Sequence, residues 1–227
     1  IAKERPILFN GPMVRAILEG RKTQTRRIIG SKKKPVDTFI QDTQFIDGKE
    51  QSLGFEDENG GWFDTEEMCP YGHKGDRLWV RETWWQAGDS HPTYPDDDEE
   101  KWLGSRRVHY SADGPPPNEP NKFYPNGLSG KSYSAADPNK FWKKRPSIHM
   151  PRWASRIDLE ITRIGVERLQ DISEEDAKAE GMVSLYTDKY THFLEFCDTW
   201  KEIYGANSWD ANPWVWVVKF KRVETTE

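Results

Sequence analysis

Apolar residues recur at helical spacing in three segments of the chain. In 191–205, aromatic and aliphatic side chains share one stripe, which is typical of an amphipathic helix. A shorter stripe covers 10–20, where Pro12 suits the first turn, and a third segment, 171–182, has Ser173 as a candidate N-cap. Each segment ends at a glycine suited to a left-handed exit: Gly20, Gly181 and Gly205. The pattern therefore predicts three helices.

Alternation of apolar and charged positions predicts strands between these helices. The clearest case is 155–169, whose Ile and Leu residues alternate with charged ones as in a half-buried strand. Asp47-Gly48 predicts a hairpin turn. The other extended segments are 22–29, 74–85 and 212–223. Strands from both ends of the chain, with helices between them, predict the α+β class and a mixed or antiparallel β-barrel.

The pattern breaks down between about residues 85 and 145. Much of the proline lies here with the acidic run 96–100, and 106–112 ("RRVHYSA") alternates like a strand. We interpret the stretch as a long insertion with little regular structure, within a single domain that spans 1–227. Insertions of this length are usually functional.

The composition is polar for a folded chain, with 35% hydrophobic residues and a mean hydropathy of −0.91. The 11 Trp, 8 Tyr and 10 Phe can still fill a core that aliphatic residues leave thin. Cys69 and Cys197 form no CxxC, which predicts a reducing, cytoplasmic location and neither a metal nor a cofactor. No apolar run approaches the ~20 residues that span a bilayer, so no membrane partner is expected.

Charge is distributed unevenly, although the net charge is only −5. Residues 15–34 hold eight basic residues against one acid, Glu19, and a second basic run over 143–156 surrounds His149. Acidic side chains gather instead at 96–100. Two basic patches set apart from an acidic loop favour an anionic ligand bound at one face.

Four motifs carry a family resemblance by their order: "ILEGRKTQTRR" (17–27), "GDRLWVRE" (75–82), "ISEEDAKAEGM" (172–182) and "WVWVVKFKRV" (214–223). In this arrangement the chain resembles the ASCH domain family, and "IHMPRWASRI" (148–157) resembles that family's longer phage and prophage members. The resemblance covers roughly 6–29, 74–84, 146–182 and 209–223. It implies a PUA-like β-barrel with flanking helices, a cleft for a nucleoside or nucleic acid, RNA rather than DNA, and a bacterial cell as the setting.

The resemblance also implies catalytic residues. One bacterial member of the family is an amidohydrolase that removes the acetyl group of N4-acetylcytidine with a lysine, a threonine and a glutamate. The matching positions here are Lys22, Thr25 and Glu180, with Gly181 where that protein has asparagine. The side chains expected to contact substrate are Arg21, Arg26, Arg27, Arg81, Glu82, Trp84, Arg152 and Trp153.

Each of these residues also has an ordinary structural interpretation. Taken alone, Lys22 is a solvated charge, Thr25 a simple strand residue and Glu180 an acid on a helix surface. Arg81 and Glu82 are a candidate cross-strand pair. Trp84, like its tryptophan neighbours, is a candidate for the core or rim of the barrel.

The proposed chemistry makes two demands on the structure. Lys22 can take the Thr25 proton only if its pKa falls from about 10.4 toward 7–8, which needs ~3–4 kcal/mol of destabilisation of the ammonium. Arg21, Arg26 and Arg27 would lower that pKa, whereas an ionised Glu180 would raise it. In addition, Lys22 and Thr25 point to opposite faces of an ideal strand, so they converge only if 22–25 contains a turn or bulge at the helix exit, which Gly20 would permit.

Three functions remain open from the sequence. The first is hydrolysis of the acyl amide of a modified cytidine, and the second is a PUA-like reader that binds a modified or single-stranded base without changing it. Ribonuclease activity has less support, because no two histidines lie near the motif. The oligomeric state is not predicted.

Overall fold

The computed structural model describes residues 2–30, 45–46, 49–50, 54–56, 62–64, 68–92, 100–117, 142–183 and 191–223. These residues form an α+β fold, as the sequence predicted. The chain divides into two compact units. The first unit comprises Ile1–Ile7, Ala16–Trp79 and Ile157–Glu227, and the second comprises Leu8–Arg15 and Val80–Arg156.

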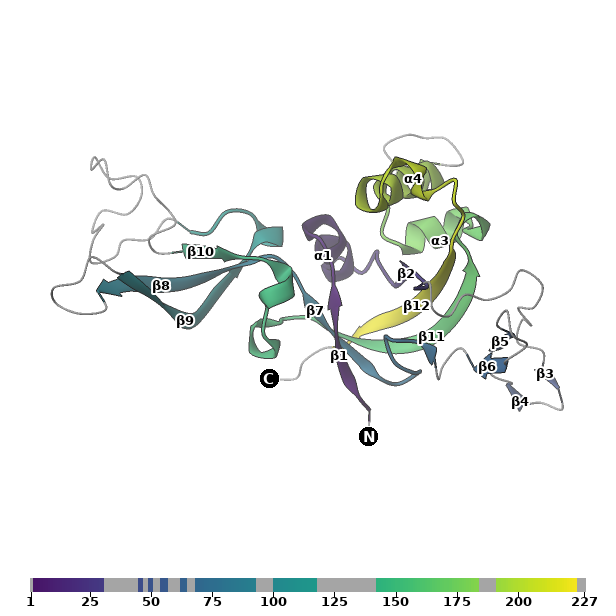
Figure 1. The fold of residues 1–227 in the computed structure, drawn as a ribbon, viewed down its shortest axis with the longest axis horizontal. Helices are drawn as coiled ribbons and strands as arrows, with labels where there is room; N and C mark the ends of the chain where they lie inside the picture. The colour runs from purple at the N-terminus through teal and green to yellow at the C-terminus, as the bar shows by residue number, and fades with distance from the viewer. Residues whose placement is uncertain are drawn as a thin grey trace. The chain divides into compact units, whose positions relative to one another are not determined.

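A five-stranded sheet organises the first unit (Figure 1). Its strands, in spatial order, are β1 (Glu4–Leu8), β7 (Arg77–Arg81), β11 (Asp158–Arg168), β12 (Trp214–Val223) and β2 (Gln24–Ile28). β11 pairs antiparallel with both β7 and β12, and β12 pairs antiparallel with β2. The strands predicted at both ends of the chain are therefore confirmed, and they meet in one sheet.

The three predicted helices are confirmed as α1 (Gly11–Leu18), α3 (Glu174–Ala179) and α4 (Thr191–Tyr204). The Ser173 hydroxyl accepts a hydrogen bond from the backbone N–H of Asp176, so the predicted N-cap forms. In Figure 1, α3 and α4 lie on one side of the curved β11–β12 pair. Their apolar side chains pack there with two residues of β12 in one cluster: Leu169, Ile172, Ala177, Phe196, Trp200, Val215 and Val217.

β12 is buried on both faces, since its residues from Trp214 to Val218 are all buried. Val215 and Val217 face the helices, while the alternate residues Trp216 and Val218 pair with Val166 and Ile164 of β11 on the opposite face. This double burial explains the nearly continuous apolar run in the closing strand.

The second unit contains a three-stranded antiparallel sheet in the order β10-β8-β9 (Figure 1). Its strands are β8 (Trp84–Pro92), β9 (Glu100–Tyr110) and β10 (Trp142–Arg145). The expectation of little regular structure in 85–145 is therefore wrong at these positions. A register shift between the Gln86–Val108 and Gly88–Gly104 pairs leaves two extra residues on β9, which interrupts the alternation of that strand.

The predicted hairpin turn at Asp47-Gly48 lies outside the described residues, but its flanks agree with it. β3 (Phe45–Ile46) and β4 (Lys49–Glu50) pair antiparallel, and a second short pair joins β5 (Gly54–Glu56) to β6 (Trp62–Asp64). The acidic residues 96–99 also lie outside the described part of the chain. Among the described residues, no helix combines the length and apolar character needed to cross a membrane.

Candidate functional site

The link between α1 and β2 places Lys22 beside the end of α3. The backbone N–H groups of Arg21 and Lys22 both donate to the Ala16 carbonyl, so the chain turns tightly as it leaves α1. Lys22 then forms an isolated antiparallel bridge with Glu180, and Thr23 donates its N–H to the Ala179 carbonyl. The chain therefore turns before Lys22, not between Lys22 and Thr25 as the chemistry demanded, and this turn brings together segments more than 150 residues apart in the sequence.

Lys22 and Glu180 form a buried ion pair. The Lys22 Nζ donates to Glu180 Oε2 at 2.7 Å and to the Glu180 backbone oxygen at 2.9 Å. The exposed fractions of the two side chains are 0% and 3%, respectively. The ordinary interpretations of Lys22 as a solvated charge and of Glu180 as a surface acid are therefore wrong, because each side chain supplies the partner that makes burial of the other tolerable.

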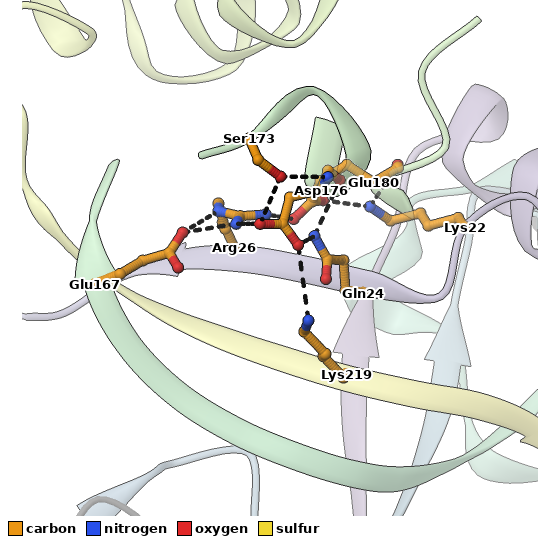
Figure 2. Close-up of polar contacts among 8 residues, drawn as sticks. All are labelled: Lys22, Gln24, Arg26, Glu167, Ser173, Asp176, Glu180 and Lys219. Atoms are coloured by element: carbon orange, nitrogen blue, oxygen red, sulfur yellow. Dashed lines mark hydrogen bonds and ion pairs between the residues drawn. The ribbon is translucent and has the colours of Figure 1, made fainter. Parts of the chain in front are cut away.

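Arg26 extends this pair into a larger group of charges (Figure 2). Its guanidinium is fully buried: Nε donates to Glu167 Oε1 at 2.7 Å and Nη1 donates to Glu180 Oε1 at 3.1 Å. Nη2 forms ion pairs with Glu167 at 2.6 Å and with Asp176 at 3.4 Å. We name the whole set the ionic cluster: Lys22, Gln24, Arg26, Glu167, Asp176, Glu180 and Lys219. Its three carboxylates and three cations balance in formal charge.

Burial and charge shift the pKa values within the ionic cluster in different directions. Burial lowers the pKa of Lys22 below its ordinary 10.5; Glu180 opposes this shift, whereas Arg27 and Arg26 add to it. Burial raises the pKa of Glu167 against the opposing effect of Arg26. For Asp176, burial acts upward, but the Gln24 hydrogen bond and the charge of Arg26 bring the pKa below its usual value.

Gly181 allows the close approach of α3 to the Lys22 segment. Its φ is +88°, a conformation that side-chain-bearing residues rarely adopt. A Cβ there would lie 2.8 Å from the Ala16 Cβ and 2.9 Å from the Lys22 Cβ. Glycine therefore stands where the resemblance expects asparagine, because this backbone packs directly on the lysine.

Thr25 does not join the ion pair. The side chains of Lys22, Gln24 and Arg26 all reach residues 176–180, so they share the face of β2 that looks toward α3. Thr25 alternates with them and pairs in register with Val218, whose side chain lies on the other face of the sheet. It is buried there, with a residue exposure of 2%. The structure thus brings two of the three predicted catalytic residues together, and the strand alternation separates the third from them.

The two neighbouring arginines take different positions. Arg21 donates to the Gly181 carbonyl at 2.7 Å and pairs with Glu19 near the surface. Arg27 is half-buried and pairs in register with Trp216, which places its side chain on the same face of β2 as that of Thr25.

The remaining predicted contact residues belong to the second unit. Arg81 donates to the Met150 carbonyl at 3.0 Å. Glu82 is 1% exposed and is held by two nitrogens of Arg156 at 2.9 and 3.2 Å. Burial raises the pKa of Glu82. The ion-pair partner of Glu82 is thus Arg156, not its neighbour Arg81, and Arg156 also binds Asp113 and lies 3.9 Å from the centroid of the Tyr110 ring.

The two tryptophans of this group differ in exposure. Trp84 is buried in a small core with Met150 and Ala154, as its structural interpretation predicted. Trp153 is 43% exposed and packs edge-on against Trp84, with ring centroids 5.9 Å apart. Arg152, beside it, is exposed.

Sequence reasoning missed the carboxylates that pair with Arg26. Glu167 lies in an alternating strand and Asp176 in the acidic first turn of a helix, and both positions are ordinary for solvated acids. The only local signal is a run of polar residues at alternate positions of β2, which is unusual for a strand in this buried environment. Within the described ranges, no group of three or more His, Cys, Asp or Glu side chains is arranged to hold a metal ion.

The chain matches no family model, no curated protein and no solved structure. Fold and site alone therefore define its class: an α+β protein with a buried lysine–glutamate pair between the start of β2 and the end of α3.

Proposed function

We propose that this chain is an ASCH-like protein that binds a modified cytidine and hydrolyses its acyl amide. In this proposal the sheet of the first unit is the core of a PUA-like β-barrel. The observation that carries it is the buried contact of 2.7 Å between Lys22 and Glu180, two residues that the motif resemblance selects from distant parts of the chain. Buried titratable residues with a shifted pKa, as burial gives Lys22, cluster at functional sites.

The reaction needs a base and a proton donor. A nucleophilic oxygen forms a bond to the acyl carbon, the C–N bond breaks, and the exocyclic amine leaves with a proton. Where the oxygen is that of Thr25, water then cleaves the acyl-threonine ester and releases the carboxylic acid. Burial lowers the pKa of Lys22, which favours the neutral amine that can accept the nucleophile's proton. The ammonium formed in this way is stabilised by Glu180, its nearest carboxylate, and is the proton source for the leaving amine.

Thr25 is the proposed nucleophile on the resemblance alone. Its position on the other face of β2 argues for testing it separately from Lys22. Thr25→Val removes the hydroxyl at nearly constant volume. Loss of turnover in that variant supports a threonine nucleophile, whereas retained turnover assigns the attack to water.

The test is incubation of the full chain with a panel of N4-acylated cytidines, with release of cytidine followed by chromatography. Wild type should give product, and Lys22→Met should reduce the rate by at least about 100-fold, the scale of general-base catalysis. Lys219→Met is the matched control, since Lys219 belongs to the same cluster but is 42% exposed. Absence of product from every substrate with folded wild-type protein would refute the hydrolase.

A reader that binds the base without turnover is the second candidate. The observation that favours it is the balance of the ionic cluster, in which Lys22 already donates to two oxygens of Glu180. A lysine held in this way is well satisfied as an ammonium. Saturable binding of an acylated cytidine, with no product after prolonged incubation, would support the reader over the enzyme.

A further inference from the structure

One face of the three-stranded sheet in the second unit combines accessible indole rings with cations. Residues paired across β10, β8 and β9 share a face, so Gln86 lies on the same side as Val108 and Lys143. Trp84, Tyr110 and Arg145 form the adjacent row on that side. We name this side of the sheet the tryptophan–cation face.

Two glycines let long side chains lie flat on the tryptophan–cation face. A Cβ at Gly88 would lie 2.5 Å from the Trp102 ring, and a Cβ at Gly104 would lie 2.4 Å from the Gln86 amide. Trp102 and Gln86 therefore rest directly on the backbone of the neighbouring strand.

The face has two accessible indoles, Trp102 of β9 and Trp153, which lies in the short turn Arg152–Ala154 and packs against Trp84 of this face; each lies next to a cation. Lys143 Nζ is 5.7 Å from the centroid of Trp102, and Arg106 Cζ is 5.6 Å from that of Trp153. Both cations are exposed, Trp102 is half-buried and Trp153 is 43% exposed. The cation–π distances fall within the ~6 Å range of such contacts.

Among the side chains that the structure describes in the second unit, no carboxylate forms an ion pair with either cation. Only two carboxylates occur there, Glu82 and Asp113, and both are bound by Arg156. Within this described set, neither Arg106 nor Lys143 has a carboxylate partner. Aromatic rings and cations that alternate on one surface suit a nucleic-acid strand, because its bases can stack on the rings and its phosphates can pair with the cations.

We propose that the tryptophan–cation face of β8–β9–β10 binds single-stranded nucleic acid, with a base stacked on Trp153 and phosphates paired with Arg106 and Lys143. This surface is built within the second unit and does not rest on the hydrolase proposed for the Lys22–Glu180 pair. Stacking and phosphate pairing use groups common to RNA and DNA, so both serve as probes.

The test measures fluorescence anisotropy of labelled oligo-U and oligo-dT of about 12 nucleotides with the full chain at about 50 and 200 mM salt. Trp153→Ala should weaken binding at least about fivefold at either salt concentration. Arg106→Gln/Lys143→Gln should weaken binding and reduce the slope of log affinity against log salt by about 0.7 for each lost phosphate contact.

The matched control is Arg163→Gln/Arg222→Gln, which removes two exposed arginines of the first unit and should change neither affinity nor slope. Unchanged circular dichroism and urea midpoints establish that each variant is folded. The proposal is overturned if neither oligonucleotide binds at the lower salt concentration, or if duplex DNA binds as tightly as the single strands. It is also overturned if the control pair weakens binding as much as the Arg106/Lys143 pair, or if Trp153→Ala has no effect. Hydrolysis of a free acylated cytidine is a separate readout that the Arg106→Gln/Lys143→Gln variant should leave unchanged, so failure of one proposal does not imply failure of the other.

Discussion

Removing either partner of the Lys22–Glu180 pair should destabilise the protein, but by different amounts. Glu180→Gln and Lys22→Met each remove one charge and nearly preserve side-chain volume. In Lys22→Met, Glu180 keeps the Arg26 guanidinium at 3.1 Å. In Glu180→Gln, the ammonium of Lys22 remains fully buried and loses its nearest carboxylate, while Arg26 retains Glu167 and Asp176.

The expected magnitudes follow from this asymmetry. A buried charge that loses its partner typically costs about 3–5 kcal/mol, so Glu180→Gln should lower the free energy of unfolding by that amount. A buried acceptor that loses one of two donors costs about 1–3 kcal/mol, which is the expectation for Lys22→Met. The double variant should be less destabilised than the sum of the single variants by about 0.5–3 kcal/mol, because the stranded ammonium is gone.

Urea unfolding at pH 7, followed by circular dichroism, measures these differences through the midpoint and the m-value. The control is Lys219→Met, which should cost less than about 1 kcal/mol because that lysine is 42% exposed and lies 3.7 Å from Asp176. Equal losses of unfolding free energy in Lys22→Met and Glu180→Gln would refute the stabilisation of Glu180 by Arg26. A double variant whose loss equals the sum of the two single losses would refute the coupling of Lys22 and Glu180.

Three further predictions concern the same unit. Gly181→Ala should lower the free energy of unfolding by about 2–4 kcal/mol, because the positive φ and the Cβ contacts of 2.8 and 2.9 Å are both unfavourable. Gly20→Ala should lower it by only about 1–2 kcal/mol, because Gly20 has φ +74° but open space around its Cβ. Equal urea midpoints for the two variants would contradict this difference. Burial raises the pKa of the Cys197 thiol to about 11, so at pH 8 only about one molecule in a thousand carries the thiolate. Peptide mapping should show slow alkylation of Cys197 in native protein and rapid alkylation in urea, and fast native labelling would contradict the burial. The fold lowers the pKa of Asp176 below 3.8, so its contribution to stability is present above that pH and is lost as pH falls through the folded value. The stability difference between wild type and Asp176→Asn should therefore shrink below about pH 4, and a difference that grows toward acid would reverse the sign of the argument.

Much of the secondary structure was determined by the sequence alone. The stripe of α4, the Ser173 cap of α3, and the alternation of β11 each depend on neighbours within a few residues, and the structure confirms all three. Such signals are local, because helix periodicity, capping and strand alternation depend on backbone geometry over one or two turns. The sequence predicted the end of β9 through the alternation of 106–112 but missed β8 beyond Trp85, which holds few apolar residues, and the start of β9, which lies beyond the extra residues of its register shift.

The site was decided by tertiary structure. Lys22, Arg26 and Glu180 appear in the sequence as ordinary solvated charges, and only the resemblance linked two of them. Their burial depends on α3 and β2 meeting across about 150 residues of chain, and on Gly181 letting the two backbones touch. A charge is tolerated in a protein core only when the fold places an opposite charge from another segment beside it. No local sequence pattern predicts this pairing, because it depends on how the sheet and the helices pack together.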